Sequence, residues 1–85
     1  MKKTLLLILI GDREEAAVQV QKVLTAWGCT IKTRLGVHDG VMEDCSKQGL
    51  LFLELAGSDE EYKELARKIE LIKGVKSELV ELELD

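Results

Sequence analysis

The sequence contains no proline, only two cysteines, and one residue each of tryptophan, tyrosine and phenylalanine in 85 positions. It has no long polar tract, and 46% of its residues are hydrophobic, so a disordered chain is excluded and we expect one folded domain over residues 1–85. Small secreted domains held by disulfides usually carry more cysteines than this. We therefore expect reduced thiols and a cytoplasmic protein.

A concentrated basic patch and a long apolar segment are also missing. The formal net charge is -4, so the surface repels phosphate backbones on average and no direct DNA binding is expected. The longest apolar run, residues 5–10, is far shorter than a membrane span of about 20 residues. Asp12 follows it closely and no small-residue cleavage site is present, so we expect neither a secretion signal nor a membrane anchor.

Four segments have the patterns of β-strands. Residues 3–10 and 50–55 are apolar at nearly every position, which predicts strands that are covered on both faces. Residues 29–35 alternate with a period of two. One face would carry Cys29, Ile31, Thr33 and Leu35, and the other Thr30, Lys32 and Arg34. Residues 75–84 alternate as well, except that the adjacent Leu79 and Val80 predict a bulge or a late strand start.

Two segments have the periodicity of amphipathic helices. Asp12 and Glu15 resemble a capping box before a helix over residues 13–27, which Gly28 would end. Ser58 and Glu61 repeat the capping pattern before a second helix that ends near Gly74. The apolar stripes of the two helices are Ala16, Val20, Val23, Leu24 and Trp27, and Tyr62, Leu65, Ala66, Ile69 and Ile72.

The resulting order βαββαβ predicts an α+β, ferredoxin-like fold, in which two helices cover one face of a four-stranded antiparallel sheet. Strands one and three are then central, and their apolar side chains line the face that the helices leave open. Such a surface usually marks association, so we expect a homo-oligomer, a dimer or a tetramer, joined through sheet faces or sheet edges. The alternative is that the C-terminal tail or the long hairpin tip folds over this face.

The polar segment between strands two and three contains the most reactive side chains. His38, Asp39, Asp44 and Cys45 gather metal-binding atoms in this segment, and His38 and Cys45 could bind a divalent transition metal. A closed site would need Asp44 or a second protomer to complete it. No paired ligand spacing of known zinc sites is present, so the alternative is a solvated hairpin histidine and an incidental thiol. Arg34 could bind a ligand carboxylate, or it is an exposed charge on an edge strand.

Catalysis receives little support from the sequence. The single histidine has no serine or cysteine partner at a recognisable spacing, so we expect no enzyme. Cys29 is predicted to be a small buried hydrophobe, and Trp27 an anchor of the core or of an interface. RNA binding on the sheet would need several aromatic residues on the central strands, which offer only Phe52.

Two short segments carry a resemblance to a known family. Gly28-Cys29-Thr30-Ile31-Lys32-Thr33-Arg34-Leu35-Gly36, with its Arg-x-Gly, and Ile72-Lys73-Gly74-Val75 resemble the iron-only hydrogenase system regulators, which have an ACT-like, ferredoxin-like fold. The resemblance implies an oligomer that binds a small effector or a metal. The apolar central strands and the long polar segment also favour a module that acts through a protein partner. ACT-like domains often hold amino acids at the turn after strand one, which here contains Gly11 and Asp12. With Arg34, Gly36 and His38, these are the candidate ligand-binding residues.

Overall fold

The computed structural model describes residues 1–11, 14–38 and 49–85, and these form the predicted succession of elements. The chain runs through β1 (Lys2–Ile10), α1 (Glu14–Ala26), a short 3-10 helix (Gly28–Thr30), β2 (Ile31–His38), β3 (Gly49–Leu55), α2 (Asp59–Glu70) and β4 (Val75–Glu83). The order confirms the βαββαβ prediction and the ferredoxin-like fold.

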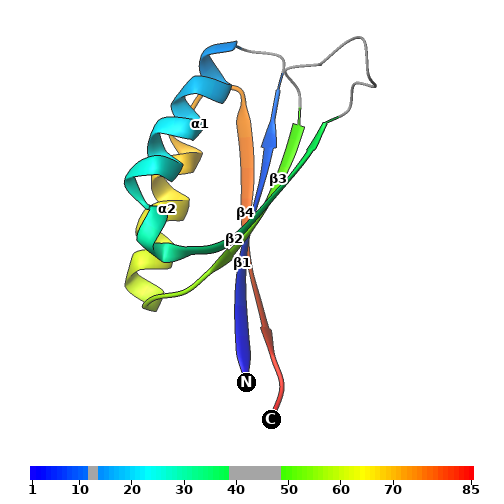
Figure 1. Ribbon diagram of the computed structural model, residues 1–85, viewed down its shortest axis with the longest axis vertical. Coiled ribbons are helices and arrows are strands. Elements are labelled where there is room, and N and C mark those ends of the chain that lie inside the picture. The colour runs from blue at the N-terminus through cyan, green and yellow to red at the C-terminus, as the bar shows by residue number, and fades with distance from the viewer. Residues whose placement is uncertain (12–13, 39–48) are drawn as a thin grey trace.

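The four strands form one antiparallel sheet in the order β2-β3-β1-β4. The two strands that are apolar on both faces, β1 and β3, are therefore central, as predicted. Both helices lie on the same side of the sheet, and none of the described residues forms a helix on the opposite side (Figure 1). The end of the sheet that holds both chain termini extends beyond the helices in the same view.

The core fills the space between the sheet and the helices. Alternate residues of the central strands point into it, because side chains in a strand alternate between the two faces. Leu6, Ile8, Leu53, Leu65 and Ile69 have no solvent-exposed surface at all. Trp27 packs against this core from just beyond α1, which confirms its predicted role as an anchor. The rest of the core consists of Ile10, Ala16, Val20, Leu24, Leu51, Leu55 and Tyr62.

The predicted irregularity of the last strand is wrong. β4 pairs with β1 without a shift from Lys2 opposite Glu83 to Ile10 opposite Val75. Leu79 lies opposite Leu6 on the helix side, whereas Val80 lies opposite Leu5 on the open side. Two adjacent apolar residues need no bulge here because each of them has an apolar partner on its own face.

The irregularity occurs instead at the start of β2. Ile31 pairs with Leu55 and Thr33 pairs with the adjacent Glu54, so Lys32 is an extra residue in β2. An extra residue in a strand reverses the sheet face to which the side chains of all later residues in that strand point. Ile31 consequently faces the helices, whereas Thr33 and Leu35 face the open side, and the prediction that these three share a face is wrong.

The predicted burial of Cys29 is also wrong. Residues 28–30 form a 3-10 turn and not the first part of a strand, so the two-residue alternation does not extend back to them. Cys29 is exposed, and Thr30, predicted to be on the polar face, is buried. The Thr30 carbonyl accepts a 2.8 Å hydrogen bond from the Ala56 amide, which ties the turn to the end of β3.

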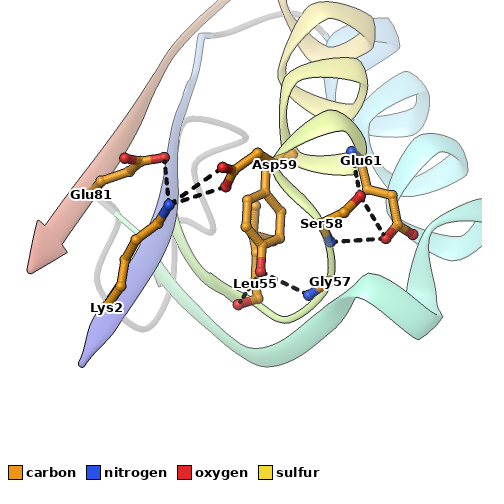
Figure 2. A network of polar contacts seen from close by, with 8 residues as sticks. Lys2, Leu55, Gly57, Ser58, Asp59, Glu61 and Glu81 are labelled. Carbon is orange, nitrogen blue, oxygen red and sulfur yellow. Dashed lines mark hydrogen bonds and ion pairs between the residues drawn. The ribbon is translucent and has the colours of Figure 1, made fainter.

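The N-terminus of α2 has the predicted capping box (Figure 2). The Glu61 amide donates to Ser58 Oγ at 3.2 Å, and the Ser58 amide donates to Glu61 Oε1 at 2.9 Å. The second bond stabilises the carboxylate and lowers the pKa of Glu61. Beside the cap, Lys2 of β1 forms an ion pair with Asp59 at 3.1 Å, which connects the first strand to the second helix.

Replacing Ser58 with alanine should lower the free energy of unfolding by about 1 kcal/mol, because one amide at the helix start loses its acceptor. Urea denaturation followed by circular dichroism would measure the change. Lys63→Ala, on the exposed surface of the same helix, is the control and should change stability by less than about 0.5 kcal/mol. Equal values for the two variants would show that the cap contributes nothing.

Candidate functional site

The sheet face opposite the helices is the most prominent candidate surface. We call it the open face, and it contains nine apolar residues on all four strands: Leu5, Leu7, Leu9, Leu35, Val37, Leu50, Phe52, Val80 and Leu82. Leu9 and Leu35 keep 52% and 58% of their surface exposed. Isolated exposed leucines are ordinary in proteins, but a contiguous set of this kind usually marks an interaction site.

Cross-strand pairing makes the open face continuous. Phe52 of β3 lies opposite Leu7 on one side and Leu35 on the other, so three strands contribute to one apolar row. Leu50 is placed in the same way between Leu9 and Val37. Directly opposite side chains on one face are about 5 Å apart, close enough to pack together. The two rows therefore form a single apolar surface in the middle of the sheet.

The C-terminal tail does not cover the open face. The Leu84 amide donates a 2.8 Å hydrogen bond to the Met1 carbonyl, so the end of the chain continues the β1–β4 ladder. Both termini lie together at one end of the sheet (Figure 1). This excludes the tail as a cover. The other predicted cover, the hairpin tip at residues 39–48, lies outside the described residues.

Charges of both signs lie at one end of the apolar centre and along its β4 side. At one end, the Glu54 carboxylate contacts Lys3 Nζ at 3.2 Å and Lys32 Nζ at 3.9 Å, and Thr33 Oγ1 donates to it at 3.4 Å. The bond from Lys3 is the main cause of the lowered pKa of Glu54. On β4, Lys76 lies opposite Leu9 and Glu78 lies opposite Leu7.

The predicted ligand residues of β2 share one face of that strand. Arg34, Gly36 and His38 lie opposite Leu53, Leu51 and Gly49, which places these three positions on the helix side. Gly49 also pairs with Ile10, so the His38 backbone and Gly11 lie at the same end of the sheet. Arg34 is four residues away along the strand, roughly 13 Å. The sheet thus brings Gly11 and His38 to one end, and Arg34 to a separate position.

The glycine at the end of β1 has a structural explanation. The Gly11 amide donates a 2.9 Å hydrogen bond to the Gly74 carbonyl, and a Cβ atom on Gly11 would lie only 3.1 Å from that oxygen. Gly74 itself has φ 85°, a conformation that favours glycine. The backbone at Gly11 therefore lies close to the Gly74 carbonyl of the same chain, and this contact alone accounts for a glycine here. Its role in binding a ligand stays a prediction.

Two other predicted site residues, Asp12 and Cys45, lie outside the described residues, and nothing is described of the His38 side chain. Across residues 1–11, 14–38 and 49–85, no group of three or more histidine, cysteine, aspartate or glutamate residues could hold a metal ion. None of the helices in this part of the chain is long and apolar enough to cross a membrane.

Comparison with solved structures identifies a relative over the whole chain. The uncharacterized protein TM1266 from Thermotoga maritima is 30% identical, with a TM-score of 0.81, over 98% of this chain and all of its own. The chain belongs to the TM1266 family. Searches of protein-family models and of curated proteins give no match.

A second solved structure supports the fold of this TM1266 family member. It is a dimeric ferredoxin-like protein of unknown function from Thermobifida fusca, with 15% identity and a TM-score of 0.52. The match covers 98% of this chain and 92% of the other. At this identity the likeness concerns the fold alone.

Proposed function

We propose that this protein is a homodimeric regulatory module, not an enzyme, in which two copies pack through their open faces. The observation that carries the proposal is the contiguous apolar surface of the open face, with Leu7, Leu9, Leu35, Leu50 and Phe52 at its centre. An 85-residue domain has a small core, and burial of this surface in a dimer would add to its stability.

The charge pattern of the open face supports a second copy as the occupant. A two-fold interface brings a surface against itself, so that surface must be self-complementary. An apolar centre with both Lys76 and Glu78 at its margin meets this requirement, because the lysine of one copy can face the glutamate of the other. The Thermobifida fusca protein of the same fold is dimeric, which is in keeping with a dimer as the assembly proposed for this chain.

The regulatory part of the proposal is supported by the resemblance of residues 28–36 and 72–75 to the iron-only hydrogenase system regulators. In this proposal the dimer acts in the cytoplasm and responds to a small effector or to a protein partner. The effector would bind at the sheet end that contains Gly11 and His38. The proposal places the effector at this end of the sheet because helices cover one face and a second copy would cover the other.

The mass of the protein in solution tests the dimer. We expect light scattering coupled to size exclusion to give twice the mass of one chain at micromolar concentration, because association removes the exposed apolar surface from water. The mass should change little with salt, since the centre of the interface is apolar. A single-chain mass at all concentrations up to millimolar would contradict the proposal.

The effector site has a separate test. Titrations of labelled protein with the twenty amino acids, and with Zn²⁺ and Ni²⁺, can be followed through backbone amide resonances. A bound effector should shift the resonances of Gly11 and of residues 36–38 and leave those of α2 unchanged. If Zn²⁺ or Ni²⁺ gives the shifts and His38→Ala abolishes them, the effector is a metal. If none of these probes shifts the resonances, the predicted location is wrong for these ligand classes.

A further inference from the structure

The two outer strands of the sheet carry opposite charges. On β2 the charged residues are Lys32 and Arg34, both basic and both exposed. On β4 they are Lys76 and three exposed glutamates, Glu78, Glu81 and Glu83, so the edge is acidic overall. Charged side chains on edge strands normally prevent pairing with other chains. When one edge is basic and the other acidic, however, the charges prevent only the pairing of two β2 edges or of two β4 edges, and they favour pairing of β2 with β4.

The apolar residues of the two edges are also complementary. On the open side, β2 presents Leu35 and Val37, and β4 presents Val80 and Leu82. Leu35 and Leu82 are among the most exposed large hydrophobic residues, at 58% and 59%. Packing one edge on the other would bring these residues together on one face, as cross-strand pairs do within a sheet.

One antiparallel register satisfies both patterns. With Arg34 opposite Glu83 of a second copy, Leu35 lies opposite Leu82 and Val37 lies opposite Val80. Arg34 and Glu83 both belong to the helix side of their strands, because their own partners, Leu53 and Lys2, do. The antiparallel alternation of the sheet continues from β4 into the second β2, since adjacent strands within each copy are also antiparallel.

We propose that the β2 edge of one copy pairs with the β4 edge of another, and that the ion pair between Arg34 and Glu83 sets the register. This contact joins two different edges of the sheet, the outer strands β2 and β4, and its apolar residues Leu35, Val37, Val80 and Leu82 also belong to the open face. Contacts of this type lead to rings when the rotation closes and to extended assemblies when it does not. The protein therefore assembles beyond the dimer as its concentration rises.

The test is a charge exchange followed by sedimentation velocity from 10 µM to 1 mM. Arg34→Glu and Glu83→Arg should each weaken assembly beyond the dimer by roughly fivefold, since an attractive pair becomes repulsive. The double variant, Arg34→Glu with Glu83→Arg, should recover the wild-type concentration dependence to within about twofold, because the attraction is restored with its signs reversed. The double variant Lys63→Glu with Glu70→Lys, on exposed positions of α2, is the control for the change of charge.

Two results would overturn the edge contact: a wild-type mass that never exceeds the dimer, or a double variant as weak as either single variant. The Leu9→Glu variant distinguishes this contact from the open-face dimer, since Leu9 lies on a central strand. If the edges pair, Leu9→Glu protein still grows in mass with concentration, and Arg34→Glu weakens that growth.

Discussion

Leu9→Glu should convert the dimer into a folded monomer at concentrations where the unmodified protein is dimeric. In a two-fold dimer the substitution occurs twice, and each copy loses apolar burial and places a carboxylate in the interface. Together these terms amount to about 3 kcal/mol, which corresponds to roughly a hundredfold rise in the dissociation constant. Light scattering across a dilution series measures this constant.

The monomer should stay folded because Leu9 is 52% exposed and lies opposite Lys76, which can pair with the new carboxylate. Val18→Glu is the matched control, since Val18 is 47% exposed but lies on α1, away from the open face. It should leave the mass unchanged. If Val18→Glu dissociates the dimer and Leu9→Glu does not, the interface is on the helix side.

Leu53→Ala should lower the free energy of unfolding by about 3 kcal/mol, the largest effect on stability that we expect from one truncation. Leu53 is completely buried on a central strand, so its truncation leaves a cavity between the sheet and the helices. Urea denaturation monitored by Trp27 fluorescence would measure the loss. Val18→Ala, at a half-exposed position, should cost less than about 0.5 kcal/mol. A Leu53→Ala cost below about 1 kcal/mol would mean that the core lies elsewhere.

Most of the fold could be predicted because its signals are local. The apolar runs in residues 3–10 and 50–55 mark strands that have neighbours on both sides, and they are the central strands of the sheet. The capping pattern of Ser58 and Glu61 places the start of α2 to the residue. The open face follows from the same strands, since helices that lie on one side cannot cover apolar residues on the other.

The errors occur where a three-dimensional contact overrides a local pattern. Cys29 and Thr30 fit a continuous two-residue alternation, but the 3-10 turn that leads out of α1 exchanges their environments. The bulge at Lys32 carries no signal of its own in the sequence. The sequence pattern predicts a bulge at Leu79 and Val80 instead, but these two adjacent apolar residues simply occupy opposite faces of the sheet.

The candidate ligand residues could be predicted only as types of side chain, not as a site. Arg34, Gly36 and His38 share a face because they alternate along one strand, which the sequence already implied. The proximity of Gly11 to the His38 backbone depends on the pairing of both β1 and β2 with β3, a long-range contact. The basic residues of β2 and the acidic residues of β4 can be read from the sequence. They predict a contact between sheet edges only once β2 and β4 are known to be the outer strands.

The most direct test of the open-face dimer is an isotope-filtered NOE experiment on a mixture of labelled and unlabelled chains. It detects contacts between copies only. We predict intermolecular NOEs that connect the Phe52 ring with the methyl groups of Leu7, Leu9 and Leu35. Intermolecular NOEs confined to the methyl groups of α1 and α2, such as Val18, or the absence of any such NOE, would contradict the account.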